Sequence, residues 1–206
     1  MVFYLEFYMA TKGHQTKQNV IVKSLDLFSV KGYYNTSVND ILEATHLTKG
    51  GLYGHFQSKE DIWYAVYEEA VTIWKTIVFK DVRNIADPLE RIKKVLDNDL
   101  RNYLGAHIFP GGCFFLNMLV ELTGQSSTMS NRILNGFIDF SKLINQWLKE
   151  AHEKNMLKPD IKFTEVASFI VISVNGCAAL YSSIRDPEIW KLTLSQLNFY
   201  ISELRQ

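Results

Sequence analysis

The sequence predicts an all-α protein of about nine helices, arranged as a small three-helix unit followed by a larger helical unit. Apolar residues recur at spacings of three and four along most of the 206 residues, and no run alternates with period two for long enough to propose a strand. Each of the four prolines falls at an expected helix boundary. Hydrophobic residues make up 47% of the chain, which is enough to bury a substantial core.

The N-terminal part is expected to form four helices, which span about residues 17–31, 38–44, 49–55 and 59–80. In the first helix Ile21, Leu25 and Phe28 follow one another at helical spacing, and Gly32 provides a C-terminal stop. Ser58 begins the long fourth helix with a capping box. Because that helix continues without a flexible linker, we expect the two units to share it, with a boundary near residue 58.

The C-terminal part is expected to form five further helices. One opens at Asp87-Pro88, with proline at the first helical position, and the glycines after Pro110 interrupt the chain before the next. The remaining helices are expected at about 113–122, in a long segment ending near Asn155, and at about 164–184 and 187–204.

Charge and cysteine content narrow the class of protein. The net charge is zero with a pI near 7.0, so no overall positive charge favours binding to nucleic acid. The segment from Lys12 to Lys59 is nevertheless locally basic, because it contains six lysines and three acidic residues. Cys113 and Cys177 are far apart and have no partners at metal-ligand spacing, which argues against a disulfide framework or a zinc site and predicts reduced thiols in the cytoplasm. We therefore expect no metal and no cofactor.

Two apolar stretches have features of a membrane or export signal. Residues 1–8 are too short for a signal sequence, and Met9 begins a more ordinary cytoplasmic start, so we expect residues 1–16 to be a partly disordered extension. Residues 166–184 have about the length of a membrane span, but their serines, asparagine and glycine suit a packed helix interface better than lipid. The sequence therefore predicts no membrane insertion.

Residues 37–56 read as a helix-turn-helix. Ser37 and Thr48 can cap two short helices, and Leu52 points to the core four residues before Phe56. The opposite face of the second short helix carries Lys49, Gly50 and Tyr53: a basic group, a backbone that can be approached closely and an aromatic hydroxyl. Such a pair of helices is what docking into the major groove of DNA requires, although a small solvated subdomain would share the pattern.

The segment "GYYNTSVNDILEATHLTKGGLYGHFQSKEDI", residues 32–62, closely resembles the DNA-binding domain of the TetR family of transcriptional regulators. The resemblance implies a helix-turn-helix domain over 17–58 and an effector-binding and dimerisation domain over 59–206. It also assigns DNA contacts or capping roles to matched residues, namely Thr36, Ser37, Thr48, Lys49, Gly50, Tyr53, His55 and Lys59.

One departure from the family pattern concerns the turn between the two short helices. The family has glycine there, whereas this chain has His46, with Leu42 and Thr45 in place of small alanines. If the turn needs a positive φ, histidine must adopt it with some strain.

The resemblance also implies a small-molecule pocket among the middle helices, for an apolar or amphipathic effector. The candidate lining residues are Trp74, Tyr103, His107, Cys113, Phe114, Asn117, Glu121, Phe137, Phe140 and Trp147, most of which would equally serve as core. Cys113 opens a helix, where the dipole can stabilise a thiolate, and "GGCFFLNMLVEL" resembles a TetR subgroup with electrophile-sensing members. A small buried thiol is the alternative.

The last two helices suggest a dimer. Apolar residues in the final helix, from Trp190 to Leu204, are spaced 4, 3, 4 and 3. The helix before it carries small residues that allow close approach. The expected interface comprises Ala167, Val171, Val174, Ala178, Trp190, Leu194, Leu197 and Ile201. The same pattern would also fit a core within one chain.

The leading functional hypothesis is therefore a homodimeric repressor that a small-molecule effector releases from a palindromic operator. The alternative is a repressor that senses oxidants or electrophiles through Cys113. An enzyme is not expected, because no nucleophile–base pair, metal spacing or phosphate-binding loop occurs, and Glu121 with His107 is the only acid–base pair to nominate. A helix-turn-helix that has lost DNA binding is disfavoured by the retained Lys49, Tyr53, His55 and Lys59.

Overall fold

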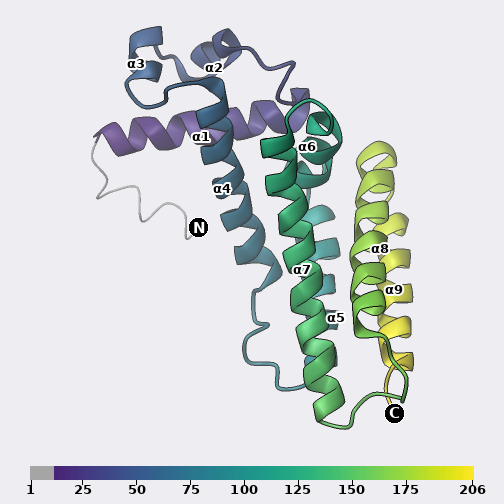
Figure 1. Ribbon diagram of the computed structural model, residues 1–206. Helices are drawn as coiled ribbons and strands as arrows, with labels where there is room; N and C mark the ends of the chain where they lie inside the picture. The colour runs from purple at the N-terminus through teal and green to yellow at the C-terminus, as the bar shows by residue number, and fades with distance from the viewer. Residues whose placement is uncertain (1–11) are drawn as a thin grey trace. The chain divides into compact units, whose positions relative to one another are not determined.

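The computed structural model describes residues 12–206, which divide into two compact units whose boundary lies between Thr72 and Ile73. Every regular element of this range is helical, apart from one isolated bridge between Leu157 and Arg205 (Figure 1). This boundary falls inside α4 (Lys59–Val78). It therefore lies later in the chain than the boundary expected near residue 58.

The first unit contains α1 (Lys12–Lys31), α2 (Val38–Thr45), α3 (Lys49–Tyr53) and most of α4. The helix α1 begins at Lys12, so residues 12–16, which we expected in a partly disordered extension, are helical; residues 1–11 lie outside the described range. The core of the first unit is apolar and almost fully buried. It includes Val20, Leu25, Phe28, Ile41, Leu52, Phe56, Ile62 and Trp63.

Local hydrogen bonds define where α2 begins and ends. Ser37 Oγ accepts from the Asp40 amide at 3.0 Å, and Asp40 Oδ2 accepts from the Ser37 amide at 2.7 Å, which completes a capping box. At the other end His46 has φ 56° and ψ 31°, the left-handed conformation. Histidine thus occupies the conformation that the turn was expected to demand of a glycine.

The second unit contains α5 (Pro88–Asp97), η2 (Asn98–Leu104), α6 (Phe114–Leu122), α7 (Ser127–Glu153), α8 (Phe163–Ile184) and α9 (Pro187–Glu203). The long helix α7 packs against α5, α6 and α8, and α8 packs against α9 (Figure 1). The buried side chains between these helices are almost all aliphatic or aromatic, as in Leu96, Leu100, Phe114, Met118, Ile144, Leu148 and Ile170.

A π-helical segment, η2, continues directly from α5. The Gly105 amide donates to the Leu100 carbonyl at 2.9 Å, a five-residue step in place of the usual four. The buried side chain of Asn98 donates to the carbonyls of Val78 and Lys80 at 3.0 and 2.9 Å, which fixes this segment to the end of α4. Sequence periodicity did not predict the π-helix, because one widened turn hardly alters the apolar pattern.

Candidate nucleic-acid interface and effector site

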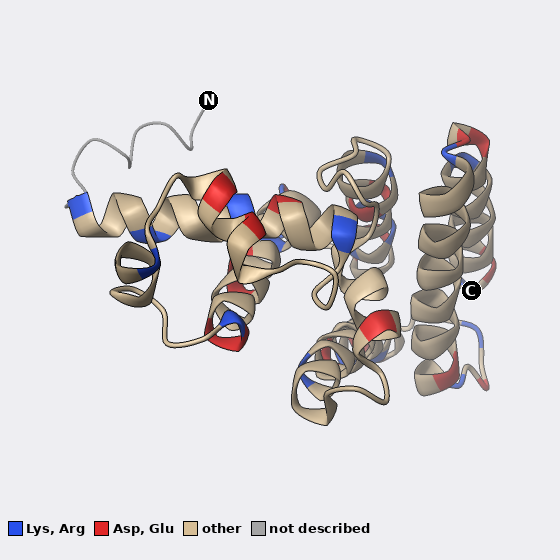
Figure 2. Ribbon diagram, turned by 90° about the horizontal axis from the view of Figure 1, so that it is seen from above, with Lys and Arg blue, Asp and Glu red and all other residues tan. Residues whose placement is uncertain are grey.

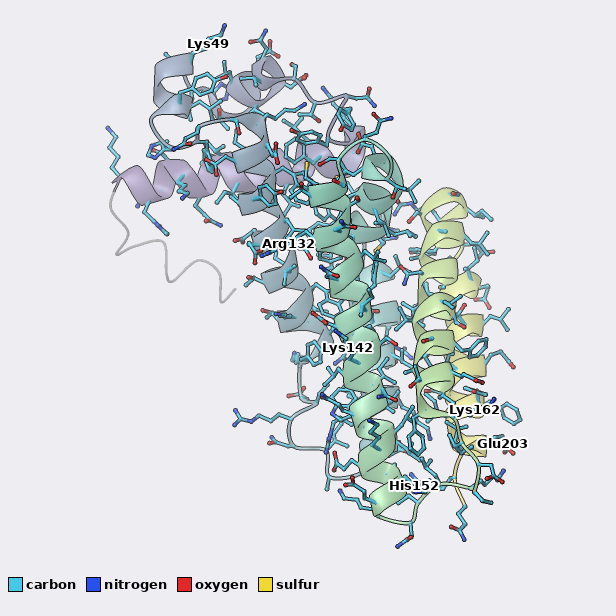
Figure 3. The ribbon with its side chains drawn as sticks, viewed as in Figure 1. Lys49, Arg132, Lys142, His152, Lys162 and Glu203 are labelled. Atoms are coloured by element: carbon cyan, nitrogen blue, oxygen red, sulfur yellow. The ribbon has the colours of Figure 1, made fainter. Side chains whose placement is uncertain are left out.

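The second helix of the helix-turn-helix presents its polar face to solvent. Thr48 caps α3 by accepting from the Gly51 amide at 3.2 Å, and Leu52 is fully buried beneath it. Lys49 is exposed and points away from α3, and Tyr53 is 50% exposed (Figure 3). The buried face therefore holds α3 in place, while a cation and a phenol remain available to a ligand outside.

Gly50 and Gly51 differ in what surrounds them. A β-carbon on Gly50 would meet nothing within 4 Å, whereas one on Gly51 would touch Thr48 Oγ1 at 3.5 Å and the Leu47 side chain. Gly50 is therefore free of internal packing requirements and leaves its backbone open to close approach from outside.

Two of the expected DNA-contacting residues form hydrogen bonds within the chain. Thr36 has no exposed surface, and its hydroxyl donates to the Gly32 carbonyl at 2.7 Å, so its prediction as a DNA contact is wrong. The ammonium of Lys59 donates to the carbonyls of Tyr33 and Thr36, both at 2.9 Å, and lies 4.2 Å from the Tyr33 ring centre. Lys59 thus closes the α1–α2 connection, a role that the sequence pattern did not reveal.

Ser37 and His55, the other matched residues near the helix-turn-helix, also have contacts within the first unit. Ser37 is exposed but engaged in the capping box, and Lys31 forms an ion pair with Asp40 at 2.7 Å. Hydrogen bonds from Lys31 and Ser37 hold the pKa of the Asp40 carboxyl well below its usual range. His55 is half-buried, and its ring lies 3.8 Å from the position of a β-carbon on Gly13 in α1.

In the second unit, several expected pocket residues meet in one aromatic cluster. The Trp74 ring contacts Phe79, Phe115 and Phe140 edge-on, with centroid distances of 5.6, 6.3 and 5.3 Å. Further ring contacts run from Phe115 through Phe114 and Phe109 to Tyr103. Trp74, Tyr103, Phe114 and Phe140 therefore lie in one cluster.

Sequence reasoning missed Asp99, which lies in this cluster on η2. It is 6% exposed, and its Oδ1 accepts a hydrogen bond of 2.9 Å from the indole Nε1 of Trp74. Burial raises the pKa of the Asp99 carboxyl to about 6, against the opposing effect of the Trp74 hydrogen bond. A signal was present, since Asp99 interrupts the apolar stripe formed by Ile92, Leu96 and Tyr103 at helical spacing.

Cys113 also lies in this cluster, at the N-cap of α6. It is 7% exposed, and burial raises the pKa of its thiol to about 11, although the amides of Leu116 and Phe115 favour the thiolate. The expected stabilisation by the helix terminus is therefore outweighed by the loss of solvent. Cys177 is a second buried free thiol whose pKa burial also raises.

The remaining expected pocket residues are placed elsewhere. Both ring nitrogens of His107 are engaged, by Tyr181 Oη at 3.0 Å and by Arg185 Nη1 at 2.9 Å, and its side chain is exposed. Asn117 donates to the Gly111 carbonyl at 2.9 Å, so it braces the loop before α6. Trp147 packs beneath the guanidinium of Arg91, and Glu121 is half-buried on α6.

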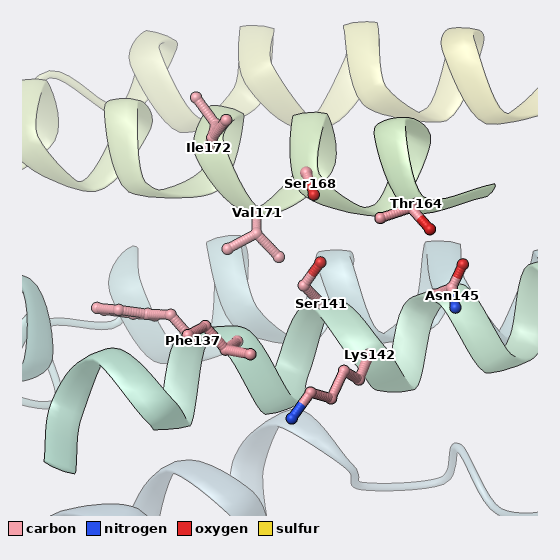
Figure 4. A pocket seen from close by; sticks show the side chains of 9 residues that line it. Phe137, Ser141, Lys142, Asn145, Thr164, Ser168, Val171 and Ile172 are labelled. Atoms are coloured by element: carbon pink, nitrogen blue, oxygen red, sulfur yellow. The ribbon is translucent and has the colours of Figure 1, made fainter. Parts of the chain in front are cut away.

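Phe137 lines a separate open groove of about 480 Å³ between α7 and α8 (Figure 4). Its other walls combine apolar residues such as Val171 and Ile172 with Ser141, Lys142 and Asn145 from α7. This groove does not include the residues of the aromatic cluster.

Most of the residues expected in a dimer interface are buried within the chain itself. Ala167, Val171, Ala178, Leu194, Leu197 and Ile201 are each at most 8% exposed, and they form the contact of α8 with its intrachain neighbours, while Val174 and Trp190 are half-buried. Six of the eight residues predicted for the interface are therefore core residues of the chain itself. Both faces of these helices are apolar, so periodicity could not distinguish the inner face from the outer one.

The outer face carries exposed large apolar side chains, namely Phe169, Ile172, Leu180 and Ile184 on α8 and Leu192 and Phe199 on α9. Glu165 is the single charged residue of α8. The ribbon of the two helices at the right of Figure 2 is accordingly mostly tan. Among the described helices, α8 alone is long and apolar enough to span a membrane, a test that core helices of soluble proteins also pass. An exposed patch of this kind marks an interaction surface.

Comparison with known proteins agrees with this architecture. An HTH-type transcriptional repressor, DhaR, from Mycobacterium sp. is 29% identical over 164 residues, which cover 78% of this chain and 79% of that protein. An HTH-type regulator from Lactococcus lactis is 30% identical over 130 residues, covering 63% of this chain and 66% of the relative. The crystal structure of a TetR regulator from Chloroflexus aurantiacus has the same fold, with a TM-score of 0.87, 24% identity and coverage of 94% and 98%.

Family models match both parts of the chain. The model of bacterial regulatory proteins of the tetR family matches residues 20–66, which include the whole helix-turn-helix. The model of the tetracyclin repressor-like C-terminal domain matches residues 88–197, just over half of the chain. The chain therefore belongs to the TetR family of DNA-binding transcriptional regulators.

Proposed function

We propose that this protein is a homodimeric transcriptional repressor that binds a palindromic DNA operator and is released by a small-molecule effector. The observation that carries the proposal is the outward face of α3, which exposes Lys49, Gly50 and Tyr53. The buried side chain of Leu52 packs this helix against the core. A lysine supplies a phosphate or base contact, and an exposed glycine lets the backbone approach the groove.

The outer face of α8 and α9 supports the dimeric part of the proposal. Phe169, Ile172, Leu180 and Ile184 form one side of α8, and a β-carbon on Gly176 between them would meet nothing within 4 Å. A second copy packed on this face would remove the exposed apolar surface from water. Two-fold symmetry would place two recognition helices about 34 Å apart, one turn of B-DNA.

The aromatic cluster supports the effector-responsive part. Pockets for small molecules are mostly apolar with a few polar groups, and Asp99 and Tyr103 are polar groups within an otherwise aromatic and aliphatic environment. Release from DNA requires that an effector bind the DNA-incompetent conformation more tightly than the competent one.

A mobility-shift assay with the DNA upstream of its own gene tests the proposal. We expect binding that weakens steeply with salt, because phosphate contacts release counterions, and Tyr53→Ala should weaken it by at least about tenfold. Tyr53→Phe, which retains the ring, should show a smaller loss. Binding that is insensitive to both substitutions would contradict the assignment of α3.

Two other functions receive less support. The relatives are transcriptional regulators rather than enzymes, and the two nitrogens of His107 are engaged by Tyr181 and Arg185. Sensing through the Cys113 thiolate is opposed by the burial that raises the pKa of this thiol to about 11.

A further inference from the structure

Asp99 is a buried acid whose charge has no cationic partner among the described residues. Its side chain keeps 6% of its surface, and the only hydrogen bond found for it in residues 12–206 comes from Trp74 Nε1, at 2.9 Å. An ionised carboxylate can accept about four hydrogen bonds. A buried carboxylate with one neutral donor leaves most of its lost hydration uncompensated, which is costly unless a ligand completes the site.

The groups around Asp99 can stabilise a positive charge. Trp74 lies within ring contact of Phe79, Phe115 and Phe140, so the carboxylate borders a wall of aromatic rings. The face of an aromatic ring attracts a cation, most strongly where water is excluded. Trp74 and Phe79 are themselves only half-buried, so the cluster is accessible on that side.

Tyr103 provides a second unsatisfied polar group in the same place. It follows Asp99 by four residues on η2 and is 4% exposed, and its hydroxyl has no hydrogen-bond partner within the described part of the chain. The hydroxyl lies near the Cys113 thiol and the Phe114 amide without the geometry of a hydrogen bond to either. Buried hydroxyl groups without partners are rare in native proteins, and a bound ligand is one of the few explanations for them.

The backbone holds these two groups in position. Asp99 and Tyr103 both lie on the π-helical segment, which Asn98 anchors to the Val78 and Lys80 carbonyls, and Asn102 donates in turn to Asn98 Oδ1 at 3.0 Å. π-helical turns occur frequently at functional sites, where they reorient side chains at some cost in backbone hydrogen bonding. The anchoring keeps the carboxylate within the aromatic cluster rather than turned toward solvent.

We propose that the effector of this regulator is a cationic amphiphile, a protonated amine on an aromatic or hydrocarbon body, with Asp99 as its counter-ion and the Tyr103 hydroxyl as its second polar contact. The inference rests on the proposed effector-responsive function and narrows the chemical class of the ligand. A neutral ligand would leave the carboxylate without a counter-charge, and an anion would be repelled by it. The apolar body would contact the rings around Trp74.

A competing explanation is that Asp99 serves only to hold Trp74. In that case the carboxyl would act as a plain hydrogen-bond acceptor, and its charge would not matter. The substitution Asp99→Asn separates the two explanations, because the amide oxygen can still accept from Trp74 Nε1 while the charge is lost. Tyr103→Phe is a second variant, which retains the ring and removes only the hydroxyl.

The experiment uses three probes that share one ring system, namely 2-naphthylmethylamine, 2-naphthalenemethanol and 2-naphthoate. Binding to the full-length protein is measured by isothermal titration calorimetry at about pH 7.5, where the amine is protonated. We expect the amine to bind at least about tenfold more tightly than the alcohol and the carboxylate to bind weakest. Asp99→Asn should abolish the preference for the amine and leave the affinity for the alcohol within about threefold.

Comparison among the probes within the wild-type protein keeps the proposal testable even if a variant fails to fold. Equal affinity for the three probes, no binding of the amine, or an unchanged preference in Asp99→Asn would each overturn it. The amine is then added to the protein–operator complex in a mobility-shift assay. Selective binding without release from DNA would contradict the proposed effector response but not the cation site, whereas release by the carboxylate alone would support the response and overturn the site.

Discussion

The indole Nε1 of Trp74 donates a hydrogen bond of 2.9 Å to Oδ1 of the buried Asp99, and so joins the last turns of α4 to the π-helical segment. This contact lies inside an aromatic cluster, and within residues 12–206 it is the only hydrogen bond found for the carboxylate. Asp99 is therefore held in place at the expense of stability. Functional sites often retain such destabilising groups, because ligand binding can require a side chain that lowers the stability of the fold.

Asp99→Asn should stabilise the protein at neutral pH. The native pKa of Asp99 is about 6, above the value of 3.8 for a free side chain, so the native state binds the proton more tightly than the unfolded state. Stability contributed by Asp99 therefore falls as the pH rises from about 4 to about 6. At pH 7 removal of the charge should raise the free energy of unfolding by up to about 3 kcal/mol, less the cost of burying the amide NH₂.

Chemical denaturation between pH 4 and pH 7.5 measures this effect. The gain should be nearly complete above about pH 6 and small near pH 4. Asp97→Asn is the matched control, because Asp97 pairs with Arg101 on the surface at 2.8 Å, and its loss should change stability by less than about 1 kcal/mol at any pH. A loss of stability in Asp99→Asn at neutral pH would contradict the uncompensated charge.

Gly50→Ala should weaken DNA binding without weakening the fold. The added methyl group meets nothing within 4 Å, and alanine is favoured over glycine in a helix by about 1 kcal/mol, so thermal stability should be retained or raised. Affinity for operator DNA should fall by at least about tenfold if the backbone at Gly50 approaches the groove. Gly51→Ala is the control, because its methyl group would contact Thr48 and Leu47 within the chain. Unchanged DNA affinity in both variants would argue against the outward face of α3 as the DNA-binding surface.

Lys49 and Lys59 should separate DNA binding from stability. Lys59→Met removes the ammonium that bonds to the Tyr33 and Thr36 carbonyls, and it should lower the free energy of unfolding by about 1–3 kcal/mol. Lys49→Met should leave stability unchanged but weaken DNA binding and reduce the salt slope by about one. Denaturation and salt titration of both variants provide the measurement, and a stable Lys59→Met protein would refute the internal role.

Cys113 should react slowly with alkylating agents in the folded protein. Its thiol is 7% exposed and its pKa is raised to about 11, so both access and the thiolate fraction are reduced at neutral pH. Mass spectrometry with iodoacetamide should show labelling at least about a hundredfold slower than in denaturant. Cys177→Ser isolates the Cys113 signal, and rapid native labelling at pH 7 would revive the thiol-sensing hypothesis.

A charge on the outer face of α8 should prevent dimerisation. Ile172 and Leu180 are 68% and 58% exposed, so glutamate at both positions leaves the intrachain core untouched while opposing apolar association. Analytical ultracentrifugation should show a dimer for the wild-type protein and a monomer for the double variant. Val120→Glu on α6, which is 70% exposed, is the control and should remain dimeric; a monomeric wild type would refute the proposed interface.

Local features were predictable from the sequence. The capping box of α2, the left-handed His46 and the start of α9 at Pro187 depend on hydrogen bonds and dihedral angles within a few residues. The burial of Leu52 and the exposure of Lys49 followed in the same way, because both depend on the pattern of polar and apolar residues within one short helix. The family motif added the function of that face.

Tertiary structure decided what each apolar or charged side chain touches. The expected interface on α8 turned out to be its inner face, since both sides of this helix are apolar and only packing selects one. Lys59 proved to be an internal tie, because the two carbonyls that it contacts lie 26 and 23 residues earlier in the chain. Thr36 proved to be fully buried, which packing decides. Asp99 meets Trp74 across 25 residues of sequence, and only folding brings such distant groups into the low-dielectric surroundings that shift a pKa.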